Sequence, residues 1–86
     1  MIKVNITPRN DKGQANGYWE IYYPNSNLSF KGNYINGIIN GYWENFYDNG
    51  EPASKGNYIN GIETGYWKWN HNKNGDKPYV KEYIII

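Results

Sequence analysis

Apolar and polar residues alternate along most of this chain, and short turn sequences interrupt the alternation at regular intervals. Because successive side chains of a β-strand point to opposite sides, a period of two indicates strands that form a sheet with two different faces. The pattern predicts an all-β protein, a single-layer antiparallel meander of about seven strands, near residues 2–10, 15–23, 28–35, 38–47, 52–59, 62–70 and 78–85.

Two kinds of turn sequence separate the predicted strands. Asn36-Gly37 and Asn60-Gly61 are typical of two-residue hairpin turns, because both central residues of a type I′ turn need a positive φ. Lys12-Gly13 occupies the equivalent place earlier in the chain. The second kind is predicted to be about four residues long and rich in turn formers, at residues 24–27, 48–51 and near 72–75.

The chain repeats itself at a fixed period. Gly-Tyr-Trp occurs at residues 17–19, 41–43 and 65–67, and the heptapeptide Lys-Gly-Asn-Tyr-Ile-Asn-Gly begins at Lys31 and again at Lys55. A fixed period of about 24 residues is typical of an array of structural repeats. We therefore divide a single domain, residues 1–86, into a half unit (1–12) and three repeats (13–36, 37–60 and 61–86). An extra residue in the last repeat puts Tyr83 in the place of Tyr34 and Tyr58.

The turns predict which residues face each other across the strands. Pairing Ile35 with Ile38 sets Gly32 opposite Gly41 and Phe30 opposite Trp43. Pairing Tyr23 with Leu28 predicts two further kinds of cross-strand pair. Tryptophan faces glycine, and glutamate faces lysine, in the pairs Trp19 with Gly32, Trp43 with Gly56, Glu20 with Lys31 and Glu44 with Lys55. A glycine in a strand leaves a gap that a neighbouring aromatic ring can cover, and opposite charges across strands stabilise a sheet.

The alternation then assigns most aromatic residues to one face of the sheet, called the aromatic face below. We predict that its members bind a partner or a second copy of the chain: Trp19, Tyr23, Phe30, Tyr34, Trp43, Tyr47, Tyr58, Trp67 and Trp69. So much apolar surface needs a cover, which the sheet's own curling, a second copy or another protein would provide. The opposite face carries Tyr18, Tyr42 and Tyr66 in equivalent places, and this tyrosine row is a candidate for stacking against a ligand. The alternative is that tyrosine merely suits a half-buried strand.

Composition and charge give no support to several classes of function. There are nine basic and eight acidic residues, interspersed along the chain, so we expect no binding of duplex nucleic acid. No apolar stretch has the length of a signal peptide or a membrane span, and membrane contact is not expected. The chain has no cysteine and one histidine, His71. We therefore predict no metal site, no cofactor and no catalytic residue; Glu20 and Glu44 are read as partners of lysines rather than as an acid–base pair.

The stretch Gly-Asn-Tyr-Ile-Asn-Gly-Ile-Ile-Asn-Gly-Tyr-Trp-Glu-Asn-Phe-Tyr-Asp-Asn-Gly, residues 32–50, closely resembles the MORN repeat in its bacterial variant, and the resemblance extends from about Gly13 to Tyr83. Ser26 departs from the pattern where a turn glycine is usual, as do Asn70, His71 and Val80 in the last repeat, which suggests a degenerate cap. The resemblance implies an elongated single-layer sheet without catalytic activity. It also implies roles in protein binding or self-association, and members of this variant are often described as antitoxins.

Two functions from different classes follow. The first is a non-enzymatic module that binds a protein partner or itself, as a homo-oligomer, and that is antitoxin-like or an accessory protein of a phage or bacterium. The alternative is a protein that binds or sequesters a small ligand, such as a nucleotide signal, in a groove lined by the tyrosines. Residue usage and the lack of a signal peptide favour the cytoplasm of a bacterial cell or of a phage-infected host.

Overall fold

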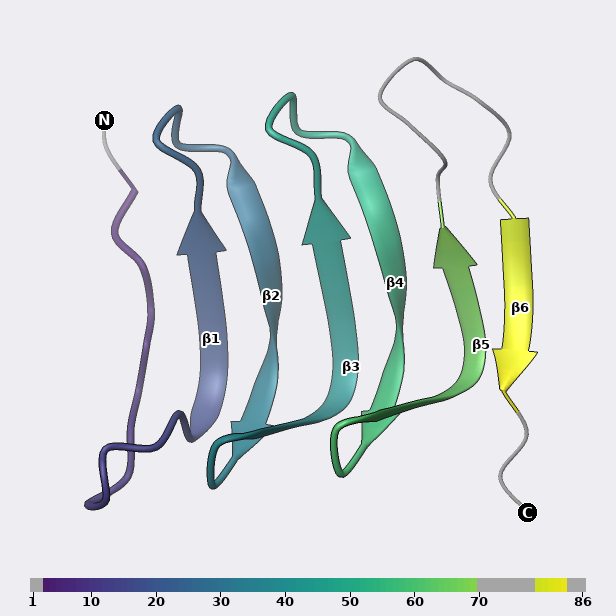
Figure 1. The fold of residues 1–86 in the computed structure, drawn as a ribbon. Coiled ribbons are helices and arrows are strands. Elements are labelled where there is room, and N and C mark those ends of the chain that lie inside the picture. The colour runs from purple at the N-terminus through teal and green to yellow at the C-terminus, as the bar shows by residue number, and fades with distance from the viewer. Residues whose placement is uncertain (1–2, 70–78, 84–86) are drawn as a thin grey trace.

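The computed structural model describes residues 3–69 and 79–83, and within them the chain forms one antiparallel sheet (Figure 1). The sheet has six strands in the order in which they occur along the chain. They are β1 (Gly17–Tyr22), β2 (Leu28–Ile35), β3 (Ile38–Phe46), β4 (Pro52–Ile59), β5 (Ile62–Trp69) and β6 (Tyr79–Tyr83). The prediction of an all-β antiparallel meander is confirmed, with one strand fewer than expected.

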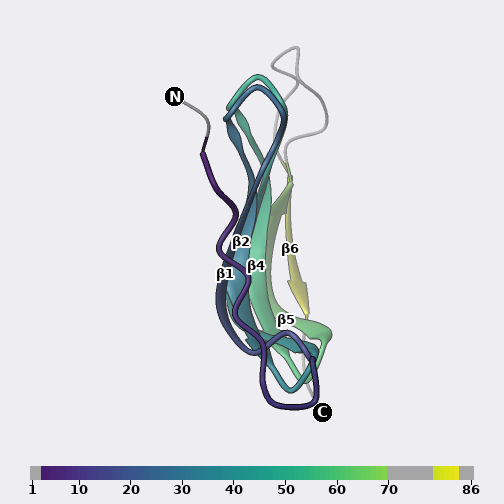
Figure 2. The same ribbon diagram turned by 90° about the vertical axis from the view of Figure 1, so that its left-hand side faces the viewer.

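The sheet is a single layer, as the edge-on view of Figure 2 makes plain. Its principal extents are 45 × 42 × 11 Å, so the third dimension is about that of one sheet with its side chains. No described element packs over either face. The interior must therefore form between side chains on one side of the sheet.

The first predicted strand, residues 2–10, is the one that does not form. This segment runs beside β1 (Figure 1), but it pairs only through isolated bridges, Ile6 with Glu20 and Arg9 with Ala15. Pro8 has no N–H to give to a ladder, and the side-chain oxygen of Asn5 accepts the Tyr22 N–H at 2.8 Å in place of a backbone carbonyl. These two residues interrupt the regular pairing that a strand requires.

The turns agree with the sequence prediction in type and differ in length. Asn36 and Gly37 have φ values of 48° and 85°, and Asn60 and Gly61 have 50° and 80°, as type I′ turns require. The two other described turns have three-residue loops rather than four, since the N–H of residue 23 bonds the carbonyl of residue 27, and that of residue 47 bonds the carbonyl of residue 51. The turn predicted near residues 72–75 lies outside the described residues. The third loop residue has a positive φ in both, 73° at Ser26 and 91° at Gly50.

The predicted register holds near the turns and shifts beyond a bulge. Ile35 pairs with Ile38, but Gly32 pairs with Trp43 rather than Gly41, because the register slips by two residues between Gly32 and Tyr34. Phe30 consequently faces Asn45 instead of Trp43. Gly41 lies in this bulge with a φ of 92°, which a residue with a side chain rarely adopts.

Across the other turns the register is close to that predicted. Trp19 pairs with Gly32 and Glu20 with Lys31, although Leu28 pairs with Tyr22 and not with Tyr23. In the next repeat Trp43 pairs with Gly56 and Glu44 with Lys55, as predicted. Tyr83 lies opposite Gly65, just as Tyr34 lies opposite Gly17 and Tyr58 opposite Gly41, so the extra residue of the last repeat does not alter the pairing.

The core consists of tryptophan rings laid over strand glycines. Trp43 lies on Gly32 and Trp67 lies on Gly56. A Cβ added to Gly32 would lie 2.1 Å from the Trp43 indole, and one added to Gly56 would lie 2.2 Å from the Trp67 indole. Each ring therefore covers the glycine of the preceding strand, not that of the following strand as the sequence suggested. Trp19, Trp43 and Trp67 are 8, 5 and 1% exposed, and they are the buried large apolar residues of the described chain.

Asparagine side chains connect each repeat to the next at the hairpin turns. The N–H of Asn36 donates to Oδ1 of Asn16 at 2.9 Å, and the N–H of Asn60 donates to Oδ1 of Asn40 at 3.1 Å, at equivalent places in successive repeats. Backbone bonds accompany them, from Gly37 to Ala15 and from Gly61 to Ile39. These bonds satisfy the turn N–H groups and explain part of the chain's high asparagine content.

Candidate binding faces

The predicted aromatic face is a continuous row of rings in contact. Trp19, Tyr34, Trp43, Tyr58 and Trp67 meet edge to face, with centroids 4.9 to 6.3 Å apart. Phe30 stacks on Trp43 at 4.9 Å and Trp69 stacks on Trp67 at 5.6 Å. Such geometries stabilise aromatic pairs beyond the area they bury. Seven of the nine residues predicted for this face are thus brought together.

The two remaining members, Tyr23 and Tyr47, lie just outside the strands, at the start of the three-residue loops. The Tyr23 hydroxyl donates to the carbonyl of Phe46 at 2.7 Å and so connects two loops. The side-chain amides of Asn25 and Asn27 both donate to the carbonyl of Asp48 at the same end of the sheet, at 2.6 and 2.8 Å. At this end, too, hydrogen bonds connect successive repeats.

The indole N–H groups of Trp19, Trp43 and Trp67 have acceptors within the chain. Trp19 donates to the carbonyl of Pro8 at 2.9 Å, Trp43 to Oδ1 of Asn45 at 3.0 Å, and Trp67 to the carbonyl of Asn57 at 3.0 Å. The Arg9 guanidinium lies 5.1 Å from the Trp19 ring centre, within cation–π range. The indoles of Trp19, Trp43 and Trp67 are therefore both covered and hydrogen-bonded in a single copy of the chain.

The opposite face, called the tyrosine face below, keeps its aromatic residues exposed. Tyr18, Tyr42 and Tyr66 are 41, 47 and 68% exposed. Two shallow grooves lie between them at equivalent places in successive repeats. The first groove, of about 210 Å³, is lined by Tyr18, Lys31, Asn33 and Tyr42, among others. The second groove, of about 240 Å³, is lined by Tyr42, Lys55, Gly56, Asn57, Tyr66 and Lys68, among others.

Exposed isoleucines extend the apolar part of the tyrosine face toward the Asn-Gly turns. Ile35 lies on this face because it alternates with Lys31 and Asn33 along β2, and Ile38 pairs with it across the turn. Ile59 and Ile62 form the equivalent pair in the next repeat. All four side chains are about half exposed or more, from 48 to 69%. They belong to neither of the residue sets predicted from the sequence, although their position beside each Asn-Gly turn repeats with the same period.

The charged pairs of the tyrosine face differ from those predicted. The Glu20 carboxylate does not form the expected ion pair with Lys31; it accepts hydrogen bonds from the hydroxyls of Tyr18 and Tyr22, both at 2.6 Å. Lys31 instead lies toward β3, with its Nζ 3.5 Å from Oε1 of Glu44. The backbone register allows Lys31 to pair with either glutamate, because Lys31 on β2 lies opposite Glu20 on β1 and opposite Glu44 on β3. The two hydroxyl donors of Glu20 could not be read from the cross-strand pattern, because they lie on its own strand.

These contacts shift the pKa values of several groups. The hydrogen bonds from Tyr18 and then Tyr22 lower the pKa of Glu20 below its ordinary 4.5. Partial burial and then the hydrogen bond to Glu20 raise the pKa of Tyr18 from 10.0 to about 12. Burial and the charge of Glu44 raise the pKa of Tyr42, and burial raises that of Tyr58. The tyrosine hydroxyls therefore stay protonated at neutral pH and act as hydrogen-bond donors.

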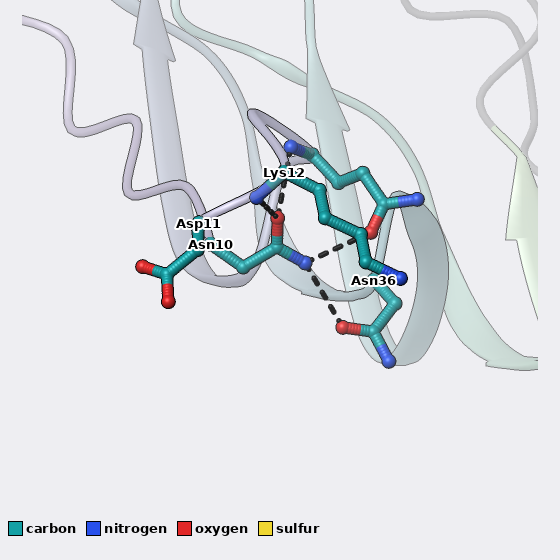
Figure 3. Close-up of a pocket in the computed structure, with 5 residues that line it drawn as sticks. Asn10, Asp11, Lys12 and Asn36 are labelled. Carbon is teal, nitrogen blue, oxygen red and sulfur yellow. Dashed lines mark hydrogen bonds between the residues drawn. The ribbon is translucent and has the colours of Figure 1, made fainter.

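A third hollow lies at the turn of residues 10–14 and is polar (Figure 3). The Asn10 side chain organises it. Its oxygen accepts from the N–H groups of Lys12 and Gln14 at 3.0 and 3.1 Å, and its nitrogen donates to the side-chain oxygens of Gln14 and Asn36 at 2.9 and 3.0 Å. Asp11 points away from this group in Figure 3. The hollow is thus built around a connection between two turns, and the Asn10 amide already has partners on both its oxygen and its nitrogen.

The groups that the sequence offered for metal binding or acid–base chemistry are placed as follows. No group of three or more histidine, cysteine, aspartate or glutamate side chains in residues 3–69 and 79–83 is placed to hold a metal ion. His71 lies outside the described residues. Glu20 and Glu44 each have a structural partner, in tyrosine hydroxyls and in Lys31 respectively. This part of the chain also contains no helix long and apolar enough to cross a membrane.

Comparison of the chain with family models, with curated proteins and with solved structures gives no match.

Proposed function

We propose that this chain is a non-enzymatic interaction module of the MORN-repeat type, which binds a protein partner or a second copy of itself. The recurrence of one sequence unit, each copy a hairpin joined to the next by equivalent hydrogen bonds, supports the module and its family. A flat, rigid sheet without a metal cluster or an enclosed pocket in its described part is suited to presenting a surface. An antitoxin-like or phage accessory role in a bacterial cytoplasm fits such a module, which has no cysteine to oxidise.

The single observation that carries this proposal is the difference in exposure between the two faces. Three of the four tryptophans of the aromatic face, Trp19, Trp43 and Trp67, are at most 8% exposed in one copy, and Trp69 is half-buried. On the tyrosine face, three tyrosines and four isoleucines are 41 to 69% exposed. Exposed aromatic and aliphatic side chains that recur across one surface are a common feature of protein interfaces. The sequence pattern predicts partner contacts on the aromatic face. We propose instead that the tyrosine face makes these contacts.

The sheet edges offer a second means of contact. Within the described residues β6 pairs only with β5, so one side of its backbone is available to another strand. Strand addition at such an edge is a recurrent mode of recognition. At the other edge, residues 3–9 lie along β1 through only a few hydrogen bonds.

Light scattering after size exclusion, over a range of concentrations, tests the proposal. We expect either a mass above the 10.1 kDa of one chain or a specific partner, with binding lost in the double variant Ile62→Lys/Tyr66→Lys. Glu63→Lys is the matched control, because Glu63 neighbours Ile62 in sequence but faces the aromatic side, opposite Tyr58. A monomer at all concentrations, together with a partner that binds the double variant as well as the parent, would contradict the proposal.

A second candidate function is the capture of a small ligand between the tyrosines. It is favoured by the two equivalent grooves, each lined by two tyrosines and by one lysine in the first groove or two in the second. Tyrosines two strands apart are separated by about 10 Å, which leaves room for a planar group between or upon them. A thermal shift with one compound of a nucleotide panel, lost in Tyr42→Ala, would support this function, since Tyr42 lines both grooves.

A further inference from the structure

The two grooves of the tyrosine face differ in charge at one repeat-equivalent position. Lys31 and Lys55 occupy the same place in successive repeats, as do the residues opposite them, Glu44 and Lys68. In the first groove Lys31 faces Glu44 and forms an ion pair with it at 3.5 Å. In the second groove Lys55 directly faces Lys68. The repeat thus replaces an ion pair with two lysines side by side.

Two like charges directly opposite each other destabilise a sheet. Glutamate at position 68, as at position 44, would be the stabilising choice, so this pair departs from the local rule that the rest of the repeat follows. In natural proteins such departures are concentrated at functional sites. The departure here lies inside a groove, beside exposed Tyr66, and not at a random point of the surface.

The neighbouring elements do not neutralise the two lysines. In the described part of the chain no ion pair joins Lys55 or Lys68 to a carboxylate. Glu44 lies across β3 from Lys55, but its carboxylate is engaged with Lys31 and interacts with Tyr42. On the other side Lys68 pairs with Val80, and Glu82 stands opposite Tyr66. The region between Lys55 and Lys68 is therefore positive on a chain whose net charge is only +1.

We propose that the second groove binds a mononucleotide-like ligand, with its phosphate between Lys55 and Lys68 and its planar base against Tyr66 or Tyr42. This inference rests on the second candidate function and specifies the groove and the ligand chemistry. Two ammonium groups suit a phosphate dianion, and an aromatic ring exposed beside them suits a base. Asn57, which lines the groove together with the two tyrosines, offers an amide to the polar edge of the base. The first groove has equivalent tyrosines and an equivalent asparagine, but its lysine is paired with a glutamate, so it serves as an internal control.

Titration of ¹⁵N-labelled protein with adenosine 5′-monophosphate, inorganic phosphate and adenosine tests the proposal. With the monophosphate we expect saturable shifts of the amides of residues 55–57 and 66–68, and little change at residues 31–33. Phosphate alone should shift the same amides more weakly. Lys68→Glu should lower the affinity for the monophosphate at least about tenfold, the loss expected for one charge-assisted contact.

The reverse exchange, Glu44→Lys, gives the first groove the charge pattern of the second. It should produce new shifts at residues 31–33 on adding the monophosphate. Equal shifts in both grooves of the parent protein, no saturable shift with the monophosphate, or no effect of Lys68→Glu would overturn the proposal. If adenosine alone shifts both grooves equally, ligand capture by the tyrosines stands and the phosphate site is wrong. If a short single-stranded oligonucleotide binds more than about tenfold tighter than the monophosphate, the ligand of the groove is single-stranded nucleic acid and the proposal of a mononucleotide is wrong.

Discussion

Trp67 and Tyr66 are neighbours in β5, yet the first is 1% exposed and the second 68% exposed. The difference lies in what the adjacent strand presents to each ring. On the aromatic face the adjacent residue is Gly56, and the indole lies flat on it. On the tyrosine face the adjacent residue is Asn57, which has a side chain where Gly56 has none. One repeat sequence therefore builds a closed core on one face and an open surface on the other.

This comparison also teaches how a single-layer sheet is stabilised without a second layer. Rings that lie over glycines and meet edge to face exclude water locally, so no partner is needed to cover them. Residues on the tyrosine face are then free to be chosen for binding. Substitutions on the two faces should accordingly have very different effects on stability.

The largest difference is expected between Trp67→Ala and Tyr66→Ala. Removing the Trp67 ring takes away the most buried side chain and its contacts with Tyr58 and Trp69, which should cost about 3–5 kcal/mol of unfolding free energy. Removing the Tyr66 ring should cost less than about 1 kcal/mol. Urea unfolding followed by circular dichroism measures both. Similar losses for the two variants would mean that the faces are not divided as described.

Gly56→Ala is the next test, because it keeps Trp67 and fills only the space above the glycine in which the indole lies. The added Cβ would lie 2.2 Å from the Trp67 ring, so the ring must move, and we expect a loss of about 1–3 kcal/mol. Asn57→Ala is the matched control on the other face, where the truncated side chain leaves the tryptophan undisturbed. The same unfolding experiment applies. A stable Gly56→Ala variant with unchanged tryptophan fluorescence would show that the ring does not need the glycine.

Charge exchange on the tyrosine face should alter stability only slightly and in a known direction. Lys68→Glu replaces two facing lysines with an ion pair like that of Lys31 and Glu44, so it should add about 0.5 kcal/mol at low salt. Glu44→Lys should remove a similar amount. Both effects should shrink as salt screens the charges, which unfolding in low and high salt would reveal. A loss of stability in Lys68→Glu would mean that the two lysines do not repel each other in the fold.

The smallest effect is in the pH dependence of Tyr18. Its pKa is raised to about 12, so the folded state favours the neutral phenol. The resulting stabilisation is complete below the ordinary value of 10.0 and is lost as the pH rises from there through about 12. The ultraviolet absorbance of the parent protein and of Tyr18→Phe is followed as the pH rises. The difference between the two curves should show one phenolate transition, at a pH well above 10.0. Glu20→Gln should bring that transition to lower pH, and an unshifted transition there would rule out the Glu20 contact as a cause.

Much of the fold could be predicted because the signals are local and repeated. Asn36-Gly37 and Asn60-Gly61 specify type I′ turns by themselves, and the fixed repeat period then sets the strands and the two faces. The predicted pairing of Trp19 with Gly32 and of Trp43 with Gly56 is confirmed, although the loops are one residue shorter than predicted, because a register shift next to each loop compensates for the difference. The MORN resemblance remains a proposal, supported by the hairpin repeat.

The rest depended on features that alternation does not report. The bulge near Gly41 needs a glycine at a φ of 92° inside a strand, and a periodic pattern gives no reason to place it there. The loss of the first strand depends on Pro8, which has no N–H to donate, and on Asn5, whose side-chain oxygen accepts a bond that a backbone carbonyl would accept in a regular strand. Lys31 contacts Glu44 and not Glu20, because the Glu20 carboxylate already accepts hydrogen bonds from two tyrosine hydroxyls. These are choices among contacts that the register leaves equally available.

The measurement that tests the central claim most directly is solvent paramagnetic relaxation of the dilute protein, with a soluble gadolinium chelate and side-chain NMR. If the aromatic face closes on itself within one copy, the ring protons of Trp19, Trp43 and Trp67 will relax slowly, and those of Tyr18, Tyr42 and Tyr66 will relax fast. Fast relaxation of the three tryptophan rings in the monomer would contradict the account, because those rings would then need a partner to cover them.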